Sequence, residues 1–430
     1  MTALLQGVEA WTAEFGRVAA SLPGFPELRR RAITRFADLG FPTGREEAWR
    51  FTDLSALAET AFRPAGGTAN PAQFAALAKG PLKACQVAFV DGRYAPQFSS
   101  LDLPPGVRVT TLATVLQEDP KRAEPYLGGL APADRNPFTA LNTAFMTDGA
   151  FVHVSRDVKA ERPIHVLFLS SFHGDPYVTY PRLLVVLEEG ASAVVAESHL
   201  GPAGGTYFTN AAAEVYLAPG ASLELCKVQR ESREAFHVAS MEARIGRDAS
   251  FVHHSISFGA KIARNDFGAV LADEGAEVEL NGLFEVGGQQ LADHHTSIDH
   301  AAPRTSSREL YKGILDGRGR GVFDGRILVR PRAQKTNANQ SSKNLLLSNE
   351  AVVHTKPQLE ILANDVKCKH GATIGQLDRD KLFYMRSRGL GLEEARRLLI
   401  HAFASEIIDH VKIDAVRAQV GGCLGLMTHV

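Results

Sequence analysis

The chain has 430 residues, 45% of them hydrophobic, which is enough for one large core or for two to three domains. Its 47 Lys and Arg residues nearly balance its 48 Asp and Glu residues, which excludes a global field that would draw the chain onto nucleic acid or an anionic membrane. The first residues carry no basic signal or transit segment, and no apolar run approaches the roughly 20 residues that span a bilayer. We therefore expect a soluble, cytoplasmic chain.

Residues 1–80 are expected to form an N-terminal helical region. The stretches "GVEAWTAEFGRVAASL" and "ELRRRAITRFADLGF" each repeat apolar residues at three- and four-residue steps. The stretch "AFRPAGGTANPAQ" that follows is typical of a linker. From residue 84 the pattern changes to short β-rich runs, with connecting helices near "LATVLQED" and "FTALNTAF".

A repeat becomes visible after Pro181, in which an apolar strand, a polar or glycine turn, a small residue and an alternating strand follow one another. The small residues Ala191, Ala221, Ala249 and Ala276 are 30, 28 and 27 residues apart. This near-constant period predicts successive rungs of a β-solenoid over residues 84–374. A two-sheet sandwich with turns at similar intervals is the alternative.

Residues 375–430 are expected to form a C-terminal helical domain. In "LEEARRLLIHAFASEIIDHV", apolar residues recur at helical steps, and two glutamates occupy the first turn. The apolar stripe, which runs from Leu392 through Phe403 to Val411, could cap the open end of the solenoid or dock a second protein.

The stretch "NDVKCKHGAT" combines two metal-binding residue types near the end of the predicted solenoid. Strand alternation puts Cys368 and His370 on one face and Lys367 and Lys369 on the other. A thiolate and an imidazole at this spacing can bind one metal from the same side, but two ligands do not fill a tetrahedral site. A buried cysteine beside a hydrogen-bonded histidine is the alternative. The lysines are expected to lower the pKa of the thiol.

The remaining cysteines and the other candidate sites are weaker. Cys85, Cys226 and Cys423 form no CxxC pair with each other or with Cys368, which disfavours a zinc knuckle, and a reducing compartment disfavours disulfides. In "DHHTSIDH", from Asp293 to His300, alternation divides the histidines between two faces. The motifs of nucleotide-binding loops, of serine hydrolases and of zinc proteases are absent from the chain.

Two stretches of the sequence resemble the SufB/SufD family of iron–sulfur cluster assembly proteins. One is residues 293–390, which include "QKTNANQSSKNLLLS" and "NDVKCKHGATIGQLDRDKLFYMRSRG", and the other is "GREEAWRFTDL" at residues 44–54. SufB-type chains carry a cysteine where this chain has Ala351 and read "FYCRQRG" where this chain reads "FYMRSRG" with Met385. The resemblance is therefore to the SufD type.

The resemblance implies a mainly β fold, a right-handed parallel β-helix between N-terminal and C-terminal helical regions. It also implies a noncatalytic scaffold that pairs edge to edge with SufB, or with itself when isolated. A transient nascent iron–sulfur cluster would be shared with SufB at the interface, with His370 as its ligand and Cys368 as ligand or sulfur relay. No other cofactor is implied for the chain alone, and a sulfur donor would act indirectly.

The resemblance further implies that the C-terminal helical domain docks the SufC ATPase, which would hydrolyse the ATP. The docking surface would include Arg386, Arg388, Leu392, Leu398 and Phe403. Two other functions remain open as alternatives. One is a SufB-like homo-oligomeric scaffold, against which Ala351 and Met385 argue, and the other is a β-solenoid enzyme acting on carbohydrate.

Overall fold

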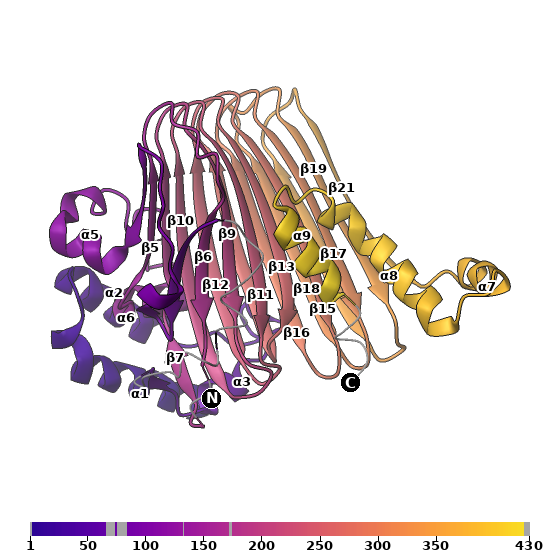
Figure 1. Cartoon of the computed structure of the whole chain (residues 1–430), viewed down its shortest axis with the longest axis horizontal. Coiled ribbons are helices and arrows are strands. Elements are labelled where there is room, and N and C mark those ends of the chain that lie inside the picture. Colours follow the sequence, from indigo (N-terminus) through magenta and orange to yellow (C-terminus); the bar gives the residue numbers. More distant parts are fainter. Residues whose placement is uncertain (1, 66–73, 75–83, 132, 172–173, 425–430) are drawn as a thin grey trace.

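The computed structural model describes residues 2–65, 74, 84–131, 133–171 and 174–424. Most of the predicted linker, residues 66–73, therefore lies outside the described residues. The described chain is mainly β, a solenoid flanked by helices at both ends, which confirms the predicted fold class (Figure 1).

Two long sheets face each other across the solenoid. One sheet, called sheet A here, contains β1 (Arg63–Pro64), β4 (Val107–Thr111), β5 (Gly149–Val154), β7 (Tyr177–Thr179), β8 (Arg182–Leu187), β10 (Tyr207–Leu217), β12 (Phe236–Ile245), β14 (Ile262–Leu271), β16 (Leu291–His300), β18 (Arg320–Val329) and β20 (Val352–Ile361). Sheet B contains β2 (Cys85–Val90), β3 (Arg93–Tyr94), β6 (Ile164–Leu169), β9 (Ser192–Leu200), β11 (Ser222–Glu231), β13 (Ser250–Gly259), β15 (Glu277–Val286), β17 (Ser306–Leu315), β19 (Asn337–Leu346) and β21 (Lys367–Gln376).

The helices lie at the two ends of the chain and between the first strands. They are α1 (Thr2–Val18), α2 (Pro26–Leu39), α3 (Ser55–Glu59), α5 (Leu112–Glu118), α6 (Pro137–Phe145), α7 (Arg379–Ser387), α8 (Leu392–Ile408) and α9 (Asp414–Cys423), with single 3-10 turns at η1 (Ala19–Ser21), η2 (Glu47–Trp49), η4 (Pro96–Phe98) and η5 (Pro120–Arg122). None of the described helices combines the length and the apolar character that crossing a membrane requires.

From β8 onward, successive strands alternate between the sheets, so each strand pairs with the strand two places along the chain. β10 pairs with β12 in parallel, for example, and β11 pairs with β13 in parallel. The strands of a sandwich built from hairpins would be antiparallel, so the sandwich alternative is wrong.

The predicted small residues lie at the tight corners between sheets A and B. Ala191, Ala221, Ala249 and Ala276 are each at most 1% exposed. Each directly follows a residue with positive φ, which is glycine in three corners (Gly190, Gly220, Gly275) and Asp248 in the fourth. Glycine and, less often, aspartate adopt this left-handed conformation at low cost, which explains the polar or glycine turn in the repeat.

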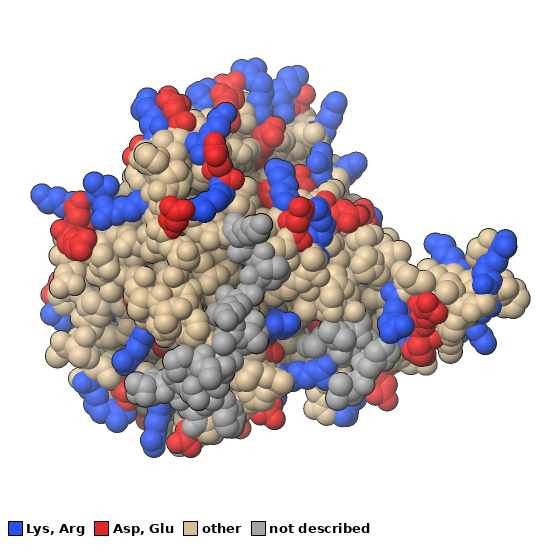
Figure 2. Space-filling view, viewed as in Figure 1, with Lys and Arg blue, Asp and Glu red and all other residues tan. Residues whose placement is uncertain are grey.

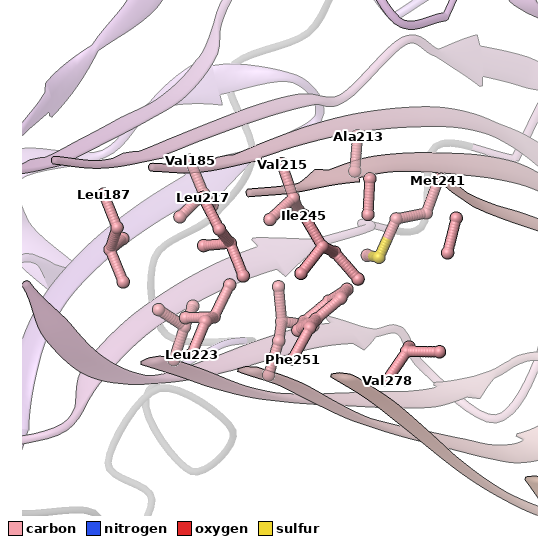
Figure 3. Packing of buried hydrophobic residues seen from close by; sticks show 14 of the residues in the cluster. Val185, Leu187, Ala213, Val215, Leu217, Leu223, Met241, Ile245, Phe251 and Val278 are labelled. Carbon is pink, nitrogen blue, oxygen red and sulfur yellow. The ribbon is translucent and has the colours of Figure 1, made fainter. Parts of the chain in front are cut away.

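The core between the sheets consists of inward side chains of both sheets. Val215, Leu217 and Ile245 of sheet A meet Leu223 and Phe251 of sheet B (Figure 3). Burying such side chains is the main favourable term in the stability of the solenoid.

The N-terminal helices cover the outer face of sheet A. Trp11, Phe36 and Trp49 belong to one buried cluster with residues of α6 and of β10 to β18. The segment at residues 44–54 lies along the sheet, where the Arg264 guanidinium stacks 3.7 Å from the centre of the Trp49 ring. Arg264 also donates to Asp293 at 2.6 Å, and Thr52 donates to the same carboxylate.

The C-terminal helices α8 and α9 lie across the outer face of sheet B (Figure 1). Ile400, Ala404 and Ile407 of α8 are buried in one cluster with residues of β11 to β19, Leu283 and Ile314 among them. Of the two alternatives for the apolar stripe of α8, capping of the open end of the solenoid is therefore wrong. The predicted apolar stripe also began too early, because its first residue, Leu392, is 44% exposed and does not belong to the buried face of α8.

Candidate functional site at the open end of the solenoid

The solenoid ends at β20 and β21, the terminal strands of sheets A and B. Residues along this end remain exposed, including Val352 at 42% and Ile374 at 52%. A terminal strand presents one row of backbone N–H and C=O groups that lack strand partners, which makes it a template for pairing with another chain. Pro357 in the middle of β20 is in a position that edge strands tolerate.

Cys368 and His370 lie on the inward side of β21, as alternation predicts. In the parallel pairing of β21 with β19, Cys368 lies beside Ala338 and His370 lies beside Gln340. Ala338 and Gln340 are both 1% exposed. Because no further rung covers β21, Cys368 is only half-buried and His370 is exposed. Both side chains are therefore accessible to a partner at the open end.

The environment of Cys368 differs from the expectation. Burial raises the pKa of the Cys368 thiol, and a hydrogen bond with the backbone of Ala338 offsets part of this shift. Lys367 and Lys369 lie on the outward face and do not appear among the causes of the shift. The prediction that the lysines lower the pKa of this thiol is therefore wrong. Binding a metal ion would displace the thiol proton.

Cys368 and His370 would offer a metal ion at most two donors. Over the described part of the chain, no three His, Cys, Asp or Glu side chains come close enough together to hold a metal ion. A thiol and an imidazole are donors suited to iron, but two donors do not complete the coordination of a metal ion.

The other histidine-rich stretches belong to the solenoid wall. His294 and His300 are buried inside it, whereas His295 faces outward and pairs with Asp293 at 3.0 Å. His253 points inward and His254 outward, and both are buried. Alternation predicted this division between faces, which leaves no compact group of ligands.

The residues predicted to dock SufC lie on the C-terminal helices. Arg386 and Arg388 are exposed at the end of α7, and Leu398 of α8 is 47% exposed. Phe403 is different, because it packs against the cluster beneath α8 and lies 4.5 Å from the Lys312 ammonium. In Figure 2 the arm formed by α7 and the start of α8 carries most of its charge as Lys and Arg.

Two aromatic residues of the same arm were missed. Phe383 is 74% and Tyr384 58% exposed, although large apolar side chains are usually buried. The adjacent pair "FY" in a short helix rich in charged residues was the available signal.

The N-terminal segment also reaches the open end, which the sequence analysis did not anticipate. The Phe51 ring stacks on the imidazole of His354 in β20 with centroids 3.9 Å apart, and Lys356 of β20 pairs with Glu47. The segment therefore ties β20 to the helices that cover sheet A.

Comparisons with known proteins agree with this architecture. The family model described as the SufBD core domain of SUF system FeS cluster assembly matches residues 170–403, and the model of the SufBD protein N-terminal region matches residues 18–166. The chain belongs to the SufBD family.

Its relatives in this family match along most of their length. An iron–sulfur cluster assembly SufBD family protein of Synechocystis is 35% identical, over 93% of this chain and 90% of the relative. The iron–sulfur cluster assembly protein SufD of Escherichia coli is 31% identical, over 90% of this chain and 89% of the relative. The chloroplastic protein ABCI7 of Arabidopsis thaliana is 30% identical, over 93% of this chain and 85% of the relative.

In this SufBD-family chain, Ala351 and Met385 stand at the two positions where we expect cysteines in SufB-type chains. Ala351 is 6% exposed and packs with Phe284 and Val286 just before β20. Met385 is half-buried in α7. The chain is a SufD homologue in a family of iron–sulfur cluster assembly proteins of the SUF system.

Proposed function

We propose that this chain is a noncatalytic scaffold that pairs with SufB through its open end, where a nascent iron–sulfur cluster forms between the two chains. The observation that carries the proposal is the pair of accessible ligands, Cys368 and His370, on the last rung of an uncovered solenoid. A partner that continues the sheets would bury the exposed apolar residues of this end and bring its own ligands to the cluster. In isolation, a second copy of the chain would occupy the same edge.

The proposal assigns different roles to the two ligands. His370 is exposed and would bind iron through a neutral ring nitrogen. Cys368 lies deeper and would act as ligand or sulfur relay after losing its proton. All four cysteines are free thiols, which agrees with a reducing, cytoplasmic location.

Replacing His370 with alanine is expected to lower the cluster content of the assembly reconstituted with SufB, SufC, iron and sulfide by at least roughly tenfold, because loss even of a ligand's hydrogen-bond partner costs that much. The fold should be unaffected, since an exposed side chain away from the core contributes within about 0.5 kcal/mol. Visible absorption and Mössbauer spectra measure the cluster. Lys369→Ala, on the outward face of the same strand, is the matched control. Unchanged cluster content in the His370 variant would refute the assignment.

We further propose that residues 375–430 dock the SufC ATPase. The arm formed by α7 and the start of α8 has exposed apolar side chains beside Arg386 and Arg388, which is a composition that protein interfaces favour. ATP hydrolysis on SufC would then act on the paired scaffold by favouring one of two arrangements of the complex.

Substituting aspartate for Leu398 is expected to weaken SufC binding by about thirtyfold, since the loss of an interface hot spot costs about 2 kcal/mol or more. Calorimetry or surface plasmon resonance would measure the Kd, with Ala10→Asp, at an exposed position of α1 outside residues 375–430, as control. Equal Kd values for the two variants would count against docking at α8. Truncation after Leu390 is a poorer test, because it would also uncover the apolar face of sheet B.

A further inference from the structure

Inside the solenoid, a row of side chains on sheet B leads directly to His370. The register aligns Glu309 of β17 with Gln340 of β19, and Gln340 with His370 of β21. Glu309 and Gln340 are each 1% exposed. Neighbouring strands lie about 4.8 Å apart, so Gln340 is the inward residue of the preceding strand directly beside His370.

The amide of Gln340 is held in one orientation. Its Nε2 donates to Glu309 Oε2 at 2.6 Å. Opposite it on sheet A stands Gly325, where an added Cβ atom would collide with Gln340 Nε2. The Gln340 amide therefore occupies space that a larger residue at position 325 would fill. Its nitrogen is already hydrogen-bonded to Glu309 of the preceding strand.

The carbonyl oxygen of the same amide differs from its nitrogen in its hydrogen bonding. Gln340 Oε1 is buried and, in the described residues, accepts no hydrogen bond. A buried acceptor without a donor costs about 1–3 kcal/mol, so such groups are rare unless a partner arrives in the functional state. The nitrogen faces Glu309, which leaves the oxygen as the acceptor available to the next rung, where His370 stands.

We propose that Gln340, oriented by Glu309, is a positioning residue for His370. Its Oε1 accepts a hydrogen bond from one ring N–H of His370 and leaves the other ring nitrogen unprotonated and directed at the open end. Histidines that bind metals usually donate their second ring N–H in this way, which fixes tautomer and orientation. The inference rests on the proposed ligand role of His370 and names the residues that prepare that ligand.

Gln340→Met tests the inference, because it keeps the length of the side chain and removes both hydrogen-bonding groups. The isolated full-length chain is labelled with ¹⁵N-histidine, and the tautomer of His370 is read from its ring nitrogen shifts, assigned by loss of the signals in His370→Ala. One tautomer of His370 is expected to dominate in the parent protein. In Gln340→Met, His370 is expected to show the mixture of tautomers that is typical of free imidazole. Gly325→Ala, which displaces the amide, should have the same effect.

Asn344→Leu on the same strand is the matched control. Asn344 is also a buried amide, 3% exposed, and its Oδ1 accepts no hydrogen bond in the described residues. Its neighbour on β21, however, is Ile374 and not His370. This variant should leave the tautomer of His370 unchanged. The same tautomer distribution in the parent and in Gln340→Met would overturn the inference.

A second readout separates this inference from the proposed function. In the reconstituted assembly, Gln340→Met is expected to shorten the lifetime of the cluster by 10- to 100-fold, whereas Asn344→Leu is not. If His370→Ala abolishes the cluster and Gln340→Met has no effect on tautomer or lifetime, the ligand role stands and the positioning role fails. If Gln340→Met changes the tautomer while His370→Ala leaves cluster content intact, the hydrogen bond is real but the ligand role is wrong.

Discussion

Lowering the pH from 7 to 4.5 is expected to unfold this protein, because its solenoid buries histidines in their neutral form. Burial lowers the pKa of five histidines, to about 4 for His165, His237 and His300 and to about 3 for His253 and His294. In the unfolded chain each would titrate near 6.5. Between the folded-state pKa values and pH 6.5, the unfolded state binds more protons than the folded state. The free energy of unfolding therefore decreases as the pH falls below 6.5.

Two buried carboxylates act in the opposite direction. Burial raises the pKa of Glu242 and Glu309 to about 7, so between pH 4.5 and 7 the folded state binds these protons and the unfolded state does not. Five histidines less two carboxylates leave a net uptake of three protons on unfolding. Three protons correspond to about 4 kcal/mol per pH unit, which exhausts a typical stability of roughly 5–15 kcal/mol within a few pH units.

Circular dichroism of the chain during acid titration would measure this transition. His294→Leu removes one of the buried histidines, which packs 5.1 Å from the Phe284 ring and has no hydrogen-bond partner in the part of the chain described. The variant should unfold at a lower pH than the parent, and His401→Leu, at an exposed position of α8, should not. A fold that persists unchanged to pH 4 would contradict the expectation.

Replacing Glu214 with glutamine is expected to cost about 3–5 kcal/mol, because the change leaves the buried charge of Arg182 without its counterion. Both side chains are 0% exposed, and Arg182 Nη2 lies 2.5 Å from Glu214 Oε1. The Glu214 carboxylate also accepts hydrogen bonds from the backbone N–H groups of Gly128, Leu130 and Ala131 at 2.8, 2.9 and 3.2 Å. Arg182 donates in turn to Asn142 of α6 at 3.0 Å. The pair therefore joins sheet A to the segments that cover it.

Urea denaturation would measure this loss with two probes. The chain has two tryptophans, Trp11 and Trp49, and both pack against α6, so their fluorescence reports on the N-terminal region. Circular dichroism reports mainly on the solenoid. Glu189→Gln is the control, since its partner Arg156 and Glu189 itself are 65% and 51% exposed and such pairs contribute about 0–1 kcal/mol. Equal urea midpoints for the two variants would show that the buried pair is not a stabilising link.

The shared strand face of Cys368 and His370 was predictable because it depends on local geometry. Alternation along a strand separates Cys368 and His370 from the lysines whatever the rest of the chain does. The pKa of the Cys368 thiol was not predictable in this way, since it depends on burial against a rung 30 residues earlier in the chain. The same holds for Gln340 and Glu309, whose strand pattern alone gave no sign that they share a row with His370.

The period of the small corner residues correctly predicted the stacked rungs, but only the parallel strand pairing excluded the sandwich and showed the alternation between two sheets. It could not establish which surface the amphipathic helix α8 covers, because its apolar residues would fit either the open end or the side of a sheet. Contacts such as that of Ile400 with the cluster containing Leu283 and Ile314 placed it on the side and left the end free. Repeats follow from backbone conformation within a few residues, whereas docking depends on the shapes of surfaces formed by residues about a hundred positions apart.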